Sequence, residues 1–236
     1  MNTIIFDVDD TLYDQALSFH QTFRKLVKEN STYQELDAIY RASRKYSERL
    51  FDQSEKGEIT TFEWQTGRFI KALNDFNISI SSETASDFND VYKQQQGRIT
   101  LFPEIKELLS ILKQKGTQLA ILTNGEEQHQ TMKIKQLELH KWIPEENIFI
   151  SGSHGIAKPN KEIFDIVTDK LKCDPVETVY IGDSFEKDII GAKQAGWQAI
   201  WMNHRNRKIP KESTVFPDLE LQHAREILSY FEDNKY

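Results

Sequence analysis

The sequence predicts an α/β protein built on a doubly wound parallel sheet, with an all-helical domain inserted into it. Short apolar runs rich in β-branched residues alternate with helical patterns in the second half of the chain. All six prolines lie at or after position 103, and eight of the ten glycines lie at or after position 97. The stretch 14–97 has almost none of these helix-breaking residues and repeats its apolar residues at helical spacing.

The apolar runs predict five buried strands, and the alternation with helices makes their sheet parallel. The strands are expected at 3–6, 118–122, 147–150, 178–181 and 199–202. Residues 1–13 and 101–236 would then form the α/β core, and residues 14–100 the helical insert. Two chain crossings, near Tyr13 and Leu101, would connect the two parts and could act as hinges.

The insert is expected to contain about four amphipathic helices. Thr60 and Glu63 have the spacing of a capping box, which predicts a helix that begins at Thr61. In the core, Pro103 and Gly116 are expected to bracket one helix, and Gly196 to close another that starts near Glu186. The polar ending EDNKY is expected to fray.

Charge and composition exclude several classes of protein. Thirty-seven acidic side chains oppose 30 basic ones, giving a net charge of −7, so no general field attracts a nucleic acid polymer. The mean hydropathy of −0.60 and the absence of an apolar run near the ~20 residues that span a bilayer exclude a membrane protein. The single Cys173 and the acidic amino terminus indicate a cytoplasmic protein, expected as a monomer or weak homodimer.

Polar residues follow the ends of the predicted strands, where ligands bind in such sheets. Asp7 and Asp9 come directly after the first strand, and crowded carboxylates of this kind favour a hard divalent cation such as Mg²⁺. Alone, the acids would be read as a solvated loop. The other strand ends add polar groups that are each unremarkable by themselves: Thr123 and Asn124, then Lys158, then Asp183, Ser184 and Asp188. Together they indicate a phosphoryl-transfer site.

Four segments carry a resemblance to a known family: FDVDDTLYD, ILTNG, AKPNKEIF and GDSFEKD, in this order. They resemble the four motifs of the haloacid dehalogenase superfamily, whose fold is a Rossmann-like core with, in its first subclass, a helical cap domain inserted after the first motif. The resemblance covers nearly the whole chain, and the insert at 14–100 is similar to that cap.

By this resemblance, each site residue receives a role. Asp7 would be the nucleophile that forms an aspartyl-phosphate, and Asp9 the acid and base. Lys158, Thr123 and Asn124 would bind the phosphoryl group. Mg²⁺ would be held by Asp7, Asp183 and the backbone carbonyl of Asp9, and Asp188 and Ser184 would support these ligands without touching the metal.

Elementary chemistry adds two expectations about the acids. An aspartate that donates a proton needs a raised pKa, whereas a metal-bound nucleophile must stay ionised. Asp7 and Asp9 are two residues apart, so on extended chain both side chains would point the same way, with Asp10 turned to the other side and not catalytic.

The same resemblance narrows the reaction. Dehalogenases lack an equivalent of Asp9, so the expected activity is a magnesium-dependent phosphatase of a small phosphorylated metabolite. TNGEEQHQTMKI, with Gln130 and Lys133, resembles the branch of pyrimidine 5'-nucleotidases and N-acylneuraminate-9-phosphatases, so a nucleoside monophosphate or a sugar phosphate is the expected substrate. A phosphomutase of the β-phosphoglucomutase type and a phospho-aspartate signalling module remain alternatives.

Some other residues are interpreted as structural. His20, near the start of the insert, is a candidate contact for the substrate leaving group, but a solvated or structural histidine is the preferred interpretation. The aromatic residues Phe62, Trp64 and Phe69 are expected to pack in a core, and the basic run Arg205, Arg207 and Lys208 to form a solvated loop.

Overall fold

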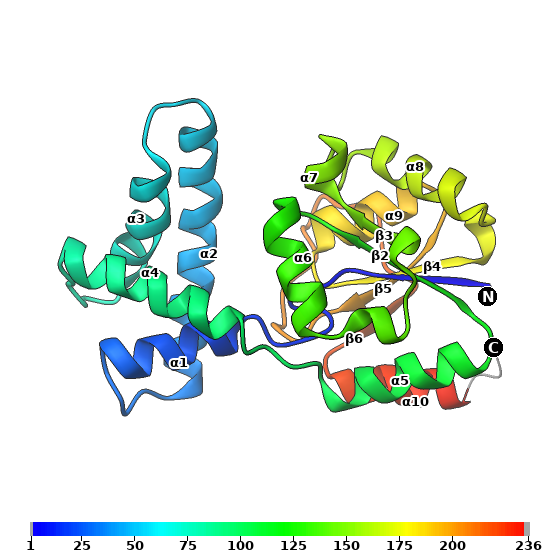
Figure 1. Ribbon diagram of the computed structural model, residues 1–236, viewed down its shortest axis with the longest axis horizontal. Helices are drawn as coiled ribbons and strands as arrows, with labels where there is room; N and C mark the ends of the chain where they lie inside the picture. The colour runs from blue at the N-terminus through cyan, green and yellow to red at the C-terminus, as the bar shows by residue number, and fades with distance from the viewer. Residues whose placement is uncertain (1, 234–236) are drawn as a thin grey trace. The chain divides into compact units, whose positions relative to one another are not determined.

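The computed structural model describes residues 2–233, which fall into two compact units (Figure 1). One unit combines the residues up to 14 with those from 100 onward, and the other comprises residues 15–99. The chain segments at this boundary lie side by side within the first unit, because the amide of Phe102 donates to the carbonyl of Leu12 at 3.0 Å.

The first unit contains a parallel six-stranded sheet in the order β3-β2-β1-β4-β5-β6. Its strands are β1 (Thr3–Phe6), β2 (Gln118–Thr123), β3 (Ile148–Ile150), β4 (Thr178–Gly182), β5 (Gln198–Met202) and β6 (Leu219–Leu221). The two central strands β1 and β4 are buried along their whole length, as expected of a parallel sheet covered on both faces. The predicted fold class is confirmed.

The sixth strand was not predicted. β6 is three residues long, and its central residue Glu220 is exposed, so the segment has no apolar run for sequence patterning to detect. It pairs with β5 only, through Leu219 opposite Ile200 and Leu221 opposite Met202, and it forms the edge of the sheet.

Helices cover both faces of this sheet (Figure 1). Those of this unit are α5 (Pro103–Gln114), α6 (Glu127–Gln136), α7 (Ser151–His154), α8 (Lys161–Leu171), α9 (Ile190–Gln194) and α10 (Ala224–Asp233). α5 and α10 lie side by side, and on the other face α8 packs against α9 over a core that includes Phe164 and Trp197. α10 reaches into the ending that was expected to fray, and residues 234–236 lie outside the described part of the chain.

The helix boundaries in this unit agree with the sequence except at one place. Pro103 occupies the first turn of α5, and Gly116 follows that helix with φ +76°. Near Glu186 the chain first forms a π-helical turn, Phe185–Ile189, before α9 begins, and Gly196 follows with φ +82°. The wider turn brings Asp188 inward, where it is 1% exposed.

The second unit consists of four helices, as predicted: α1 (Ala16–Leu26), α2 (Tyr33–Glu55), α3 (Thr61–Asn74) and α4 (Ser82–Gln96). The capping box is present, since the Thr60 hydroxyl accepts from the Glu63 amide at 3.1 Å and the Glu63 carboxylate accepts from the Thr60 amide at 2.8 Å. An aromatic cluster forms the core: Phe19, Phe23, Tyr40, Phe69, Phe88 and Tyr92.

Four residues of this unit were assigned structural roles from the sequence, with mixed outcomes. Trp64 is half-buried, and its indole nitrogen donates to the carbonyl of Ser47 at 3.0 Å. Phe69 is buried in the core, and His20 is buried with its ring edge-on to Tyr33. Phe62 was expected in a core but is 57% exposed, because it lies in the first turn of α3, outside the stripe that faces the other helices. Among residues 2–233, no helix has the length and apolar character needed to cross a membrane.

Candidate active site

The site begins where β1 ends. Asp7 follows Phe6 and keeps a ladder bond, its amide donating to the carbonyl of Ile181 at 2.9 Å. Its side chain is buried and accepts from the Lys158 ammonium at 2.9 Å and, at 3.5 Å, from the Thr11 hydroxyl. Burial raises the pKa of Asp7 to about 6, against the opposing pull of Lys158.

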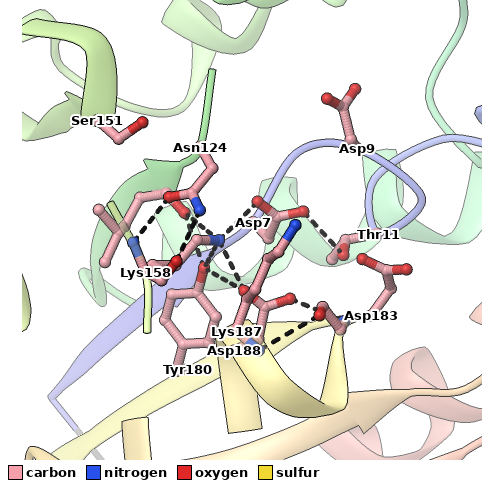
Figure 2. Close-up of polar contacts among 12 residues, drawn as sticks. Asp7, Asp9, Thr11, Asn124, Ser151, Lys158, Tyr180, Asp183, Lys187 and Asp188 are labelled. Carbon is pink, nitrogen blue, oxygen red and sulfur yellow. Dashed lines mark hydrogen bonds and ion pairs between the residues drawn. The ribbon is translucent and has the colours of Figure 1, made fainter. Parts of the chain in front are cut away.

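Lys158 joins the ends of three strands (Figure 2). Its buried ammonium lies 2.9 Å from Oδ1 of Asp7, 2.7 Å from Oδ1 of Asp188 and 2.6 Å from the hydroxyl of Tyr180, and it also donates to the carbonyl of Leu122 at 3.1 Å. Burial alone would lower the pKa of Lys158, but the two carboxylates raise it well above its usual value. The lysine is therefore a fixed cation between Asp7 and Asp188.

Three carboxylates lie close together at this edge. One oxygen each of Asp7, Asp183 and Asp188 lies within 4.8 Å of the other two. Burial and the neighbouring acids raise the pKa of Asp183 to about 8, even though the Arg207 guanidinium donates to its Oδ2 at 2.9 Å. The pKa values of Asp7 and Asp183 are raised because both groups are buried and their negative charges, together with that of Asp188, are not fully balanced by nearby cations. This set of carboxylate oxygens therefore fits a divalent cation.

Asp188 and Ser184 are bonded to each other, and their expected role of supporting the metal ligands stays a prediction. The second oxygen of Asp188 accepts from the Ser184 amide at 2.9 Å, and the Ser184 hydroxyl accepts from the Lys187 amide at 3.3 Å. Both contacts stabilise the π-helical turn and hold Asp188 against Lys158.

Asp9 stands in a separate environment. Figure 2 shows its carboxylate pointing away from the group formed by Asp7, Lys158 and Asp183. It accepts from the Lys133 ammonium at 2.7 and 2.8 Å, from the Gln130 amide at 3.0 Å and from the Tyr13 hydroxyl.

The expectation that Asp7 and Asp9 point the same way is therefore wrong. It assumed extended chain, but β1 ends at Phe6, and Asp10 adopts a left-handed conformation with φ +58°. Asp10 is buried and paired with Arg205 at 2.8 Å, and its expected lack of a catalytic role stays a prediction.

Without metal, the pKa values of the two acids lie in the opposite order from that expected for the magnesium-bound site. Although burial acts to raise the pKa of Asp9, Lys133 and the hydrogen bonds from Tyr13 and Gln130 lower it to about 2, while that of Asp7 is raised. Sequence spacing could not supply this, because Lys133 lies 124 residues away along the chain.

Thr123 and Asn124, at the end of β2, were both expected to bind phosphate, and the structure treats them differently. The Thr123 hydroxyl is buried and has no hydrogen-bond partner among residues 2–233, so it can serve a ligand. The Asn124 side chain is instead committed to the backbone of Lys158, donating to its carbonyl and accepting from its amide, both at 2.9 Å. The Asn124 side chain thus positions Lys158, and the expectation that Asn124 binds the phosphoryl group stays a prediction.

The basic run after β5 is not the solvated loop that was expected. Arg205 is buried, paired with Asp10 and with Asp14, and Arg207 bonds to Asp183. Lys208 is exposed, and no such contact joins it to another residue in the described part of the chain. Arg205 escaped the sequence analysis because its partners lie more than 190 residues earlier in the chain. Tyr180 was missed as well, because it looks like an ordinary core residue of the apolar strand TVYIG.

Comparison with known proteins agrees with this geometry. The family model of haloacid dehalogenase-like hydrolases matches residues 1–196. The chain belongs to this family of hydrolases. The match confirms the family resemblance that the four sequence motifs carry.

Individual members of the family cover the chain to different extents. Phosphoserine phosphatase from Thermus thermophilus is 30% identical over 145 residues, which are 61% of this chain and 57% of that protein. Pyrimidine 5'-nucleotidase YjjG from Escherichia coli is 27% identical over 210 residues, 88% of either chain. The solved structure of the HAD-hydrolase YfnB from Bacillus subtilis, bound to magnesium, has 25% identity and a TM-score of 0.69 over 97% of both chains.

Proposed function

We propose that the protein is a magnesium-dependent phosphatase that hydrolyses a small phosphorylated metabolite through an aspartyl-phosphate on Asp7. The observation that carries the proposal is the buried arrangement of Asp7, Lys158, Asp188 and Asp183 at the carboxyl edge of the sheet. A carboxylate nucleophile and a phosphate dianion repel each other. A buried lysine beside the nucleophile, and carboxylates that can hold a divalent cation, would offset that repulsion.

In the first step, a carboxylate oxygen of Asp7 would attack the phosphorus. The new oxygen–phosphorus bond forms as the ester bond breaks, and the leaving oxygen takes a proton from Asp9. In the second step, Asp9 would take a proton from water, whose oxygen attacks phosphorus and releases Asp7 and inorganic phosphate. A bound phosphate dianion raises the pKa of a nearby carboxyl group, so the substrate itself would oppose the low pKa of Asp9 and favour the protonated state that this step needs.

The metal would be held by Asp7 and Asp183, with the backbone carbonyl of Asp9 as a further oxygen donor. Bound Mg²⁺ would supply positive charge that offsets the repulsion between the nucleophile and the phosphate. Asp188 would remain the partner of Lys158, since the ammonium already lies 2.7 Å from its Oδ1.

Two groups are available to bind the transferring phosphoryl oxygens. The Lys158 ammonium is fixed beside Asp7, and the Thr123 hydroxyl is buried at the end of β2 without a partner among residues 2–233. Both could donate to oxygens that gain negative charge in the transition state.

The substrate class we propose is a nucleoside monophosphate or a sugar phosphate. Two relatives support this proposal. The one named pyrimidine 5'-nucleotidase matches 88% of this chain, and the one named phosphoserine phosphatase matches 61% of it. These names agree on a small phosphate monoester and differ in the group that carries it.

The test is phosphate release from a panel of nucleoside monophosphates, sugar phosphates and phosphoserine, with Mg²⁺ and with chelator. We expect release that requires Mg²⁺ and that falls by at least about 10³-fold in Asp7→Asn. Undiminished release in Asp7→Asn, or in chelator, would contradict the mechanism. A bisphosphate product formed in place of free phosphate would instead identify a phosphomutase.

A further inference from the structure

Lys133 is a buried lysine whose position the core reaction does not explain. It lies in the middle of α6 with 2% of its side chain exposed, and its ammonium bonds to both oxygens of Asp9 at 2.7 and 2.8 Å. Among residues 2–233 it has no other carboxylate partner. Burial of an ammonium is costly unless it is paired, so its place in this helix is tied to Asp9.

Gln130, one turn earlier on α6, holds the same carboxylate. Its amide nitrogen donates to Oδ2 of Asp9 at 3.0 Å and to the carbonyl of Asn124 at 2.9 Å, so both of its hydrogens are committed. The close fit depends on Gly125, where a Cβ would lie only 2.7 Å from that nitrogen. Gly125 also has φ +148°, a backbone conformation that residues with a side chain rarely adopt, so both the backbone and the close contact disfavour substitution.

The hydrogen bonds to the Asp9 carboxylate restrict the rotation of its side chain. An ionised carboxylate offers about four acceptor positions. Lys133 and Tyr13 bond to Oδ1, and Lys133 and Gln130 bond to Oδ2. The side chain is therefore fixed in one orientation, by donors from α6 and from the loop that follows β1.

This orientation suits an acid that serves the leaving group, once substrate binding frees one of its oxygens to take up a proton. In phosphoryl transfer the attacking and leaving oxygens lie roughly in line on opposite sides of phosphorus. A residue that protonates the leaving oxygen must therefore stand apart from the nucleophile. Asp9 points away from Asp7 (Figure 2), so the contacts from α6 hold it off the nucleophile, Lys158 and the metal-binding carboxylates.

We propose that Lys133, assisted by Gln130, is a positioning residue that acts on the reaction only through Asp9. Without Lys133 the Asp9 carboxylate would lose the one cation paired with it among residues 2–233 and the orientation that this cation imposes. This inference rests on the proposed function, because it assigns Lys133 to the leaving-group step of that reaction.

The experiment measures kcat and KM of Lys133→Met with phenyl phosphate and with p-nitrophenyl phosphate. We expect kcat to fall by about 30-fold for phenyl phosphate, a poor leaving group, and by less than about threefold for the nitrophenyl ester, with KM nearly unchanged. Lys133→Arg should recover part of the loss. Lys135→Met, an exposed lysine on the same helix, is the matched control and should leave both rates unchanged.

A double-mutant cycle separates positioning from a structural role. On an Asp9→Asn background, Lys133→Met should change kcat by less than about twofold, because the group it positions is already lost. Losses that multiply with those of Asp9→Asn, or equal losses for both esters, would overturn the proposal. If Lys133→Met does not fold, Gln130→Met replaces it. The kcat of Gln130→Met should fall by about fivefold for phenyl phosphate and less for the nitrophenyl ester, and equal losses for the two esters would count equally against the proposal.

Failure of the inference can be told from failure of the proposed function. If Asp7→Asn is inactive while Lys133→Met affects both esters equally, only the role of Lys133 is wrong. If Asp7→Asn keeps its activity, the mechanism itself is wrong. The coupling between Lys133 and Asp9 is also measured without turnover, since Lys133→Met should lower the Tm of the parent far more than that of Asp9→Asn.

Discussion

Asn124 and Lys158 are joined by a reciprocal pair of hydrogen bonds. The amide nitrogen of Asn124 donates to the Lys158 carbonyl, and the Lys158 backbone amide donates to Oδ1 of Asn124, each at 2.9 Å. The end of β2 thereby holds the loop that carries the lysine, and the ammonium reaches back to the carbonyl of Leu122 on β2 at 3.1 Å. Lys158 is thus fixed at both its backbone and its side-chain end.

Asn124→Ala should therefore reduce activity through Lys158. Two backbone groups would lose their partners, which costs about 1–3 kcal/mol of unfolding free energy. We expect kcat to fall by about 10- to 100-fold, because misplacement of a charged group beside the nucleophile is expensive. Urea unfolding and steady-state kinetics measure the two effects.

Asn147→Ala provides the matched control. The Asn147 side chain also bonds to a backbone carbonyl, that of Leu119 at 3.0 Å, but at the far end of β2 from the site. We expect a loss of stability with kcat preserved. An Asn124→Ala enzyme with full kcat would show that Lys158 does not need this anchor.

The pairing of Arg205 with Asp10 predicts a large effect on stability. Arg205 is 5% exposed and donates to both oxygens of Asp10, at 3.0 and 2.8 Å, and to Asp14. Arg205→Leu would take the nearest cation from the buried Asp10 and leave it with His204 and the more distant Arg207, which costs up to about 3–5 kcal/mol. Arg205→Lys should recover little, because a single ammonium cannot make the two-pronged contact.

The exposed Lys208 in the same loop gives the comparison. Lys208→Leu should change the unfolding free energy by less than about 0.5 kcal/mol. Equal effects of the Arg205 and Lys208 substitutions in urea unfolding would mean that the buried pair contributes nothing beyond a surface charge.

The sequence predicted most of the fold because its long elements have simple physical signals. A strand buried on both faces is a continuous apolar run, as in β1 and β4, and four helices of the second unit follow from apolar spacing and a capping box at Thr60. β6 was not predicted because a three-residue edge strand with an exposed Glu220 has too few buried residues to produce an apolar run in the sequence.

The site was predictable only as far as strand ends could place it. Parallel strands bring their carboxyl ends to one edge, which is why Asp7, Lys158 and Asp183 were rightly expected together. Side-chain direction beyond the last strand residue follows no period. The orientation of Asp9 depends on the left-handed conformation of Asp10 and on Lys133 from α6. Neither can be predicted from the spacing of neighbouring residues.

The raised pKa values of Asp7 and Asp183 predict a pH-dependent response to metal. The folded protein keeps protons on these groups up to about pH 6 and 8, above the ordinary value of an unfolded aspartate, so metal-free stability falls as pH rises through that window. Mg²⁺ binds the ionised carboxylates, so it should raise Tm more at pH 8.5 than at pH 5.5.

Thermal unfolding with Mg²⁺ and with chelator at the two pH values measures this effect. Asp183→Asn removes one of the raised groups and one metal ligand, so both the pH dependence and the Mg²⁺ response should shrink. A Tm increase of the same size at both pH values would contradict the assignment of these carboxylates to the metal.

The close approach of Gly182 to Asp188 predicts a catalytic defect from a single methyl group. A Cβ on Gly182, the last residue of β4, would lie 2.6 Å from Cγ of Asp188. Asp188 must then move and would withdraw from Lys158, so Gly182→Ala should lower kcat by at least about tenfold. Gly67→Ala is the control, because a Cβ there meets only Leu50, at 3.4 Å, and alanine favours the helix by about 1 kcal/mol. If Gly182→Ala retains full kcat, the contact between Lys158 and Asp188 is dispensable, and the contacts with Asp7, Tyr180 and Leu122 are sufficient to hold the lysine.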